Sequence, residues 1–327
     1  MRFRRPVARG PRDLLVERDM PERDPPQIRR TTLAAHAKIN LVLELLGPRE
    51  DGFTEIATVY QTVGLADEVE VALEPGAGDV RLEVEGDEPC SPELNLAVRA
   101  AAAVREAAEL ANGVSIRLVK RIPAGAGLGG GSSDAAAVLF ALNSLAGGPL
   151  GSAALAAIGA NLGADVPYFL CGGLVLGRGR GDELTLLDDP PEWPVVLARI
   201  GPPLGTGEVY ERARRGLTPR SDTPNILRFL SHLREDPRRR PPVFNGLQAA
   251  AGVLRPEMGR VLEQLTAAGG RASMSGSGSA VFGLFDDFET ARRAAAHLAD
   301  VEPAAWIEVT RTVSRRASDG RGVGRRR

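Results

Sequence analysis

The stretch that decides the fold is PAGAGLGGGSSDAA, residues 123–136. It follows an alternating segment, VSIRLVKRI (114–122), that predicts a β-strand, and it leads into an alanine-rich segment that predicts a helix. Five glycines occupy the seven positions 125–131, where they allow positive φ and close approach of a ligand to the backbone. The helix that follows offers unpaired N–H groups and the positive end of its dipole. This stretch therefore predicts a phosphate-binding loop.

Two common phosphate-binding motifs do not fit this loop. Gly125, Gly127 and Gly130 satisfy the G-x-G-x-x-G spacing of a dinucleotide fold. That motif needs an acidic residue about 20 residues further on, and NSLAGGPLGS (143–152) has none. No Gly-Lys-Ser/Thr follows the glycines, which excludes a P-loop. A glycine-rich turn without a ligand is disfavoured, because so many glycines cost backbone entropy for no return.

A second segment stands out because it carries almost no charge. Between residues 135 and 177 the only carboxylate or basic side chain is Asp165, in ANLGADVPYFL (160–170), although 25% of the chain is charged. Asn143, the Gly-Gly-Pro break at 147–149 and Asn161 keep each half shorter than the ~18 apolar residues of a membrane span. The segment predicts two buried helices and, after them, an aspartate that either has a function or caps a helix before Pro167.

Composition excludes several classes of protein. The net charge is −1, from 41 basic and 42 acidic residues, so no global field points to nucleic acid or to an anionic membrane. Cys90 and Cys171 have no metal-binding spacing and indicate buried thiols in a reducing compartment. The first 30 residues contain no apolar signal core. We expect a cytoplasmic protein that binds neither nucleic acid nor a membrane.

The order of elements predicts an α+β fold with two domains that meet near residues 185–195. TEIATVYQTVGLADEVEVALE (54–74) predicts a strand, a turn and a second strand. Helices are expected over 92–112, 132–148, 244–255, 256–268 and 287–299, and further strands over 31–47, 80–86, 114–122, 279–285 and 305–312, with a hairpin over 172–187. We expect a disordered leader over 1–30, an N-terminal domain over 31–190, a C-terminal domain over 191–312 and a basic disordered tail over 313–327.

The glycine loop resembles that of the GHMP kinases, in which a proline is followed after three residues by Gly-Leu-Gly, Gly-Gly-Ser-Ser and an alanine-rich helix. Further segments resemble one branch of them, the kinases that act on 4-diphosphocytidyl-2-C-methyl-D-erythritol. They are AHAKINLVLELLGPREDGF (35–53), LGADVPYFL (162–170), GRGRGDEL (177–184) and MSGSGSAVFGLF (274–285). The resemblance implies an N-terminal nucleotide domain like ribosomal protein S5, a C-terminal ferredoxin-like α/β sandwich and a site in the cleft between them.

The resemblance also implies a reaction. ATP, with Mg²⁺, would phosphorylate the 2-hydroxyl of this cytidine diphosphate-linked methylerythritol in the non-mevalonate (MEP) route to isoprenoid precursors. Asp165 would accept the proton of the hydroxyl, and Lys38 would be its cationic partner. The chemistry agrees, because transfer of a γ-phosphoryl to an alcohol needs positioning, charge neutralisation and an oriented carboxylate. A nearby ammonium keeps a poorly solvated carboxylate ionised. A surface position between two strand residues is the alternative for Lys38.

Residues that bind the two substrates follow from the same resemblance. The ATP-binding set comprises Pro123, Gly125, Gly127, Leu128, Gly129, Gly130, Gly131, Ser132, Ser133, Lys120, Asn95, Gly276, Ser277 and Gly278. Ser132 or Ser133 is the expected Mg²⁺ ligand, and a solvated strand-end lysine is the alternative for Lys120. The substrate-binding set comprises Asn40, Phe53, Thr54, Thr206 and Tyr210. Phe53 and Tyr210 would stack on the cytosine, or else pack in the core.

Some positions depart from the pattern of the branch. Thr54 stands where a histidine is usual, His36 where a proline is usual, and Asn-Gly-Leu (245–247) where Asn-Asp-Leu is usual. Thr54 opens a second hypothesis, a GHMP kinase for a different alcohol. A third hypothesis is a nucleotide-binding protein without catalytic activity. It would bind a partner through its basic terminal arms, residues 1–30 and 313–327. Deleting residues 1–30 and 313–327 distinguishes the third hypothesis, because a kinase keeps its activity. The protein is expected to be a monomer or homodimer.

Overall fold

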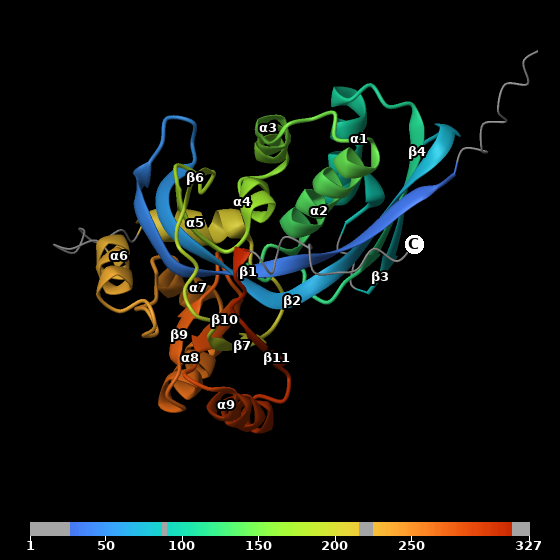
Figure 1. The fold of residues 1–327 in the computed structure, drawn as a ribbon. Coiled ribbons are helices and arrows are strands. Elements are labelled where there is room, and N and C mark those ends of the chain that lie inside the picture. The colour runs from blue at the N-terminus through green and yellow to red at the C-terminus, as the bar shows by residue number, and fades with distance from the viewer. Residues whose placement is uncertain (1–26, 87–89, 216–224, 316–327) are drawn as a thin grey trace, which may run out of the picture.

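The computed structural model describes residues 27–86, 90–215 and 225–315, and the helices and strands in these ranges form two sheets with helices packed against them (Figure 1). The predicted leader and tail lie mostly outside these ranges. Both predictions extend too far, because Arg29 and Arg30 pair with a neighbouring strand and the Val313 amide donates to the backbone oxygen of Thr62 at 2.9 Å. The Arg315 amide donates to a carboxylate oxygen of Asp189 at 2.8 Å.

The larger sheet has seven strands among the described residues, in the order β3-β4-β2-β1-β8, with β5 paired to β2 and β6 paired to β5. Its strands are β1 (Arg29–Pro48), β2 (Thr54–Ala77), β3 (Val80–Glu85), β4 (Asn112–Val119), β5 (Leu174–Arg178), β6 (Glu183–Leu186) and β8 (Phe244–Asn245). The long antiparallel pair β1 and β2 crosses the molecule (Figure 1). β8 comes from the second half of the chain and pairs in parallel with β1, which ties the two halves together.

β2 is one continuous strand, so the predicted turn inside residues 54–74 is wrong. Gly64, inside this segment, lies in the strand where the β1–β2 register shifts between His36 and Lys38. A β-carbon at Gly64 would lie 2.8 Å from the hydroxyl oxygen of Thr310, on the last strand of the other sheet. The glycine therefore permits close approach of that strand and does not reverse the chain.

Helices α1 (Leu96–Ala107), α2 (Gly130–Leu145), α3 (Ser152–Leu162) and α4 (Val166–Cys171), with the short 3-10 helix η1 (Pro92–Leu94), lie on one side of this sheet (Figure 1). Ten residues of α2 are buried, and most of them are small or aliphatic. This burial explains why the chain carries no charge over residues 135–145. α3 buries only Leu155 and Gly159. The prediction of two buried helices is thus right for α2 and wrong for α3, which covers α2 from outside.

The second sheet has the order β11-β7-β10-β9 and only antiparallel pairs. Its strands are β7 (Pro194–Arg199), β9 (Arg271–Met274), β10 (Ala280–Leu284) and β11 (Trp306–Arg311), and the helices of this half are α5 (Thr206–Arg215), α6 (Asn225–Glu235), α7 (Gln248–Leu254), α8 (Glu257–Ala267) and α9 (Phe288–Val301). Apolar residues of β7, β10, α8 and α9 form its core. No helix in the described ranges is long and apolar enough to cross a membrane.

Candidate active site

Lys38 and Asp165 meet although they are far apart in the sequence. The Nζ atom of Lys38, on β1, lies 3.5 Å from Oδ2 of Asp165, with side-chain exposures of 3% and 30% respectively. Lys38 is therefore buried, which rules out the surface alternative, while the carboxylate opens to solvent. Asp165 stands immediately before α4, but its side chain makes no capping hydrogen bond. Its carboxylate is directed to Lys38 and not to the helix.

A tyrosine that the sequence analysis did not select completes this contact. The hydroxyl of Tyr60, on β2, donates to Oδ1 of Asp165 at 3.0 Å. The Nζ atom of Lys38 lies 5.6 Å from the centroid of the same ring. Burial, and next the charge of Asp165, raise the pKa of Tyr60 well above its ordinary value. A buried tyrosine hydroxyl normally needs a partner, and that need was the available signal in TVYQTV (58–63).

Asn40 connects the buried lysine to the second glycine loop. Its Oδ1 accepts from Nζ of Lys38 at 2.7 Å and from the amide of Gly276 at 2.8 Å. Its Nδ2 donates to the hydroxyl of Thr58 at 2.8 Å. Asn40 thus fixes the ammonium next to Asp165, and its predicted contact with a substrate remains a prediction.

The two glycine loops touch each other. The hydroxyl of Ser275 donates to the backbone oxygen of Gly127 at 2.9 Å, and the Ala280 amide donates to that of Ala126 at 3.0 Å. A β-carbon at Gly276 would lie 2.9 Å from the backbone oxygen of Gly127. Side chains at these positions would separate the loops, so the glycines are needed for contact between the two halves of the chain.

The N-terminus of α2 opens beside Lys38. Gly129 takes φ +77°, and a β-carbon there would lie 2.6 Å from the Phe169 ring and 3.3 Å from Cγ of Lys38. The hydroxyl of Ser133 is turned inward and donates to the backbone oxygen of His36 at 2.7 Å. Ser132 is only half-buried. The helix end, with its free amides and the Ser132 hydroxyl, can hold an anion.

Two residues of the predicted ATP-binding set, Lys120 and Asn95, bond to other residues of the chain. Lys120 forms buried ion pairs with Asp67 and Asp134, so it is not the solvated lysine of the alternative. Burial raises the pKa of Asp134 to about 7, against the opposing effect of the Lys120 ammonium. Asn95 caps α1, its Oδ1 accepting from the Ala97 amide at 2.8 Å. These contacts support the scaffold around the loop, and a role of either residue in nucleotide binding remains a prediction.

Two of the residues predicted to bind the alcohol substrate lie in the β1–β2 turn and in α5. They are Phe53 and Tyr210. Phe53 is 55% exposed and the Arg180 guanidinium lies 5.3 Å from its ring centroid. Arg214 of α5 donates to the Gly52 oxygen at 3.2 Å, which brings the helix of Tyr210 to this turn. Burial, and next the charge of Asp165, raise the pKa of Tyr210. The core-packing alternative thus fails for the exposed Phe53, whereas Tyr210 packs partly against the core of the second half.

The other two residues of the substrate-binding set lie at the ends of these elements. The Thr206 hydroxyl, at the start of α5, lies 3.0 Å from that of Ser277 in the second glycine loop. Thr54 is only 6% exposed, and its hydroxyl has no hydrogen-bond partner among the described residues. An unpaired buried hydroxyl costs free energy, and the predicted contact of Thr54 with the substrate remains a prediction.

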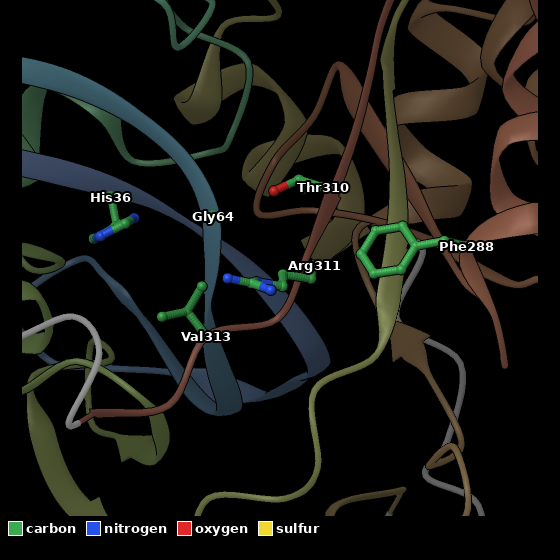
Figure 2. Close-up of a pocket in the computed structure, with 6 residues that line it drawn as sticks. All are labelled: His36, Gly64, Phe288, Thr310, Arg311 and Val313. Carbon is green, nitrogen blue, oxygen red and sulfur yellow. The ribbon is translucent and has the colours of Figure 1, made fainter.

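The structure also contains a pocket of about 370 Å³ to which none of the predicted site residues contributes (Figure 2). Its lining residues are His36, Gly64, Phe288, Thr310, Arg311 and Val313. Burial lowers the pKa of His36, and the imidazole is therefore neutral at pH 7. His36 departs from the usual proline, and it lines this pocket while its backbone oxygen accepts the hydrogen bond from the Ser133 hydroxyl.

Comparison with known proteins agrees with this geometry. The family model for the GHMP kinases N terminal domain matches residues 95–173, and that for the GHMP kinases C terminal matches residues 228–304. The chain is 42% identical over 264 residues to the 4-diphosphocytidyl-2-C-methyl-D-erythritol kinase of Solibacter usitatus, covering 79% of this chain and 82% of that protein. The identity to the enzyme of the same name from Moorella thermoacetica is 42% over 288 residues, covering 86% and 99%.

Solved structures confirm the predicted fold class. The crystal structure of a 4-(cytidine 5'-diphospho)-2C-methyl-D-erythritol kinase is 39% identical and superposes with a TM-score of 0.73, covering 87% of this chain and 100% of that chain. Homoserine kinase from Cytophaga hutchinsonii, at 21% identity and a TM-score of 0.65, shares the fold over 88% of this chain and 95% of its own. The chain belongs to the GHMP kinases, in the family of the 4-diphosphocytidyl-2-C-methyl-D-erythritol kinases.

Proposed function

We propose that the chain transfers the γ-phosphoryl group of ATP to the 2-hydroxyl of 4-diphosphocytidyl-2-C-methyl-D-erythritol, giving the 2-phosphate and ADP, in the non-mevalonate route to isoprenoid precursors. The observation that carries this proposal is the 3.5 Å contact of Lys38 with Asp165 beside two touching glycine loops. The names of its relatives supply the identity of the acceptor.

Asp165 is the proposed general base. Its carboxylate is partly open to solvent, so an acceptor hydroxyl can reach it, and it withdraws the proton as the oxygen attacks the γ-phosphorus. Such a positioned base contributes about 10²–10⁴-fold to rate. The β–γ bridging oxygen leaves with ADP, so that one P–O bond forms and one breaks.

Lys38 is the proposed electrostatic partner. Its ammonium is almost fully buried and is held by Asn40 and Asp165, which means that it is already oriented before the substrates bind. A preoriented charge in a site shielded from water stabilises negative charge that develops on the transferred group. Lys38 also partly neutralises the charge of the Asp165 carboxylate through their 3.5 Å contact.

The first glycine loop and the start of α2 are the proposed triphosphate site. Gly129 brings the backbone against Lys38, and the free amides of the first turn, with Ser132, face the phosphates. Magnesium usually keeps several waters and phosphate oxygens as ligands. Ser132 suits it better than Ser133, because Ser133 is only 3% exposed and its hydroxyl is turned inward to the His36 backbone oxygen. Bound there, the ion would neutralise phosphate charge.

Phe53 and Tyr210 are the proposed clamp for the cytosine. The exposed ring of Phe53 offers a face, and α5 brings Tyr210 toward the same turn. Stacking of one base on an aromatic ring contributes roughly 1–3 kcal/mol. In this arrangement the cleft lies between the proposed domains, residues 31–190 and 191–312. We expect the enzyme to act in the cytoplasm as a monomer or homodimer.

The function is tested by ADP release from Mg-ATP with 4-diphosphocytidyl-2-C-methyl-D-erythritol as acceptor. Homoserine and mevalonate are tested as acceptors in parallel. They test the second hypothesis, suggested by Thr54, that the kinase acts on a different alcohol. Turnover with the cytidine substrate alone supports the proposal. A protein that binds ATP and phosphorylates a different alcohol would refute the acceptor and retain the kinase.

A shortened chain tests the hypothesis of a binding module. Because residues 29–30 and 313–315 belong to the fold, the deletion should remove only residues 1–26 and 316–327. A kinase keeps its kcat within about twofold in this chain. Loss of all function when residues 1–26 and 316–327 are removed would favour the non-catalytic alternative.

A further inference from the structure

Tyr60 lies against both members of the Lys38–Asp165 pair. Its hydroxyl donates to Oδ1 of Asp165 at 3.0 Å, and its ring centroid lies 5.6 Å from Nζ of Lys38. The residue is only 2% exposed. A buried side chain that contacts both residues and donates to the proposed base can control the orientation of the Asp165 carboxylate.

The two oxygens of the Asp165 carboxylate are distinguished by their surroundings. Oδ1 accepts the hydrogen bond from Tyr60, whereas Oδ2 faces Lys38 at 3.5 Å. Without a directional donor, a carboxylate rotates broadly about its terminal torsion. We propose that Tyr60 is a positioning residue that fixes this carboxylate, so that Oδ2 receives the proton of the acceptor hydroxyl. This inference rests on the proposed function of Asp165 as the base.

Tyr60 is itself held in place on several sides. Its ring stacks on that of Tyr168, with centroids 4.7 Å apart and an interplanar angle of 30°. The Tyr168 hydroxyl points away from Asp165 and bonds the Thr62 hydroxyl at 2.8 Å and the Gly173 oxygen at 3.0 Å, so only the ring of Tyr168 contacts Tyr60. A β-carbon at Gly181 would lie 2.3 Å from the Tyr60 hydroxyl oxygen, so the loop between β5 and β6 closes over it. The hydroxyl is thereby confined beside Asp165.

The chemistry of Tyr60 suits a donor and not a second base. Burial, and next the nearby charge of Asp165, hold the pKa of Tyr60 far above the working range. The phenol therefore stays protonated and donates at every pH at which the enzyme works. A hydrogen bond to a carboxylate favours its charged form, which is the form that accepts the substrate proton.

The test is Tyr60→Phe, which removes the hydroxyl and keeps the ring. We expect kcat to fall by about 10- to 100-fold, because a lost hydrogen bond to a charged group has an effect of this order. KM for ATP and for the acceptor should stay within about twofold, because Tyr60 does not touch either in this proposal. The acidic limb of the kcat–pH profile should move to higher pH.

Tyr168→Phe is the matched control. It removes an equally buried hydroxyl from the stacked neighbour, and that hydroxyl bonds Thr62 and Gly173 instead of Asp165. It should lower the unfolding temperature and leave kcat and the pH profile in place. An equal fall of kcat in both variants, or an unchanged Tyr60→Phe enzyme, would overturn the proposal.

A double substitution and a titration separate this inference from the proposed function. In an Asp165→Asn background, Tyr60→Phe should cause no further loss of kcat, and additive losses would contradict coupling. In the ligand-free enzyme, carboxyl-carbon NMR should show Asp165 titrating at higher pH in Tyr60→Phe and not in Tyr168→Phe. That titration needs no substrate, so it decides the role of Tyr60 even if the acceptor is wrong.

Discussion

A β-carbon added to Gly127 would lie 2.2 Å from the backbone oxygen of Ser275, although the two residues belong to different halves of the chain. The same two residues share a hydrogen bond from the Ser275 hydroxyl to the Gly127 oxygen, 2.9 Å long. The proposed phosphate site therefore includes both glycine loops. The backbone of Gly127 lies too close to Ser275 to carry a side chain.

Gly127→Ala should damage nucleotide binding. The new methyl group would overlap the Ser275 oxygen, at a residue with φ +80°, and the loops would have to separate. We expect the affinity for ATP, measured by calorimetry, to fall at least about tenfold, as for a conformational cost of 1–3 kcal/mol. Gly148→Ala is the control, because Gly148 has φ +74° and no atom within 4 Å of a β-carbon. Equal ATP affinities in the two variants would contradict this account.

Lys38→Arg should not rescue activity. Lys38 fits between Oδ1 of Asn40 and Oδ2 of Asp165 as a compact point charge, whereas guanidinium is a wide planar fork. We expect kcat to fall by about 10²-fold or more in both Lys38→Arg and Lys38→Met, as for removal of a preorganised electrostatic group. Steady-state kinetics with circular dichroism as the fold control measures this. An arginine variant with wild-type kcat would show that only the charge matters.

Thr54→Val tests whether the buried threonine meets the acceptor. The Thr54 hydroxyl has no partner among the described residues, so replacing it by a methyl group should raise or preserve the stability of the free enzyme. If the acceptor supplies the missing partner, KM for the acceptor should rise by about 5- to 10-fold, with KM for ATP unchanged. A stable variant with unchanged kinetics would remove Thr54 from the substrate site.

Asp134→Asn should change the pH dependence of stability. Asp134 has a pKa of about 7 in the fold, above its ordinary 3.8, so the native state holds a proton that the unfolded state has lost between these values. Its contribution to the free energy of unfolding therefore decreases as pH rises through this window. Asparagine does not titrate. The difference in the free energy of unfolding between the variant and wild type should therefore shift in favour of the variant as pH rises from 5 to 8. Urea unfolding measures this, and a constant difference would contradict it.

Local patterns predicted the parts of the fold that local chemistry determines. The strand, glycine loop and helix around residues 114–145 follow from apolar alternation, glycine and alanine, and they appear as β4 and α2. Lys38 and Asp165 were selected for their motif and their charge, and the structure brings them into contact. The confirmed fold class followed from the same motifs.

Other features depend on contacts that no local pattern encodes. The turn predicted inside residues 54–74 is absent, because β2 is continuous through this segment and pairs with β1 on both sides of Gly64. Tyr60 was missed because an aromatic residue inside an apolar strand looks like core, and its partner Asp165 comes from the loop before α4. Helices α5 and α6 were missed as well. α5 carries many charges and buries only Val209 and Ala213, which leaves a weak apolar pattern.

The central claim is that Asp165 takes the proton of the acceptor while Lys38 and the glycine loops hold the phosphates. Its most direct test is the single-turnover rate of phosphoryl transfer, measured with enzyme in excess over acceptor, for wild type and Asp165→Asn. The account predicts a fall of about 10²–10⁴-fold with the affinity for ATP unchanged within about twofold. An Asp165→Asn enzyme that transfers phosphate at the wild-type rate would contradict it.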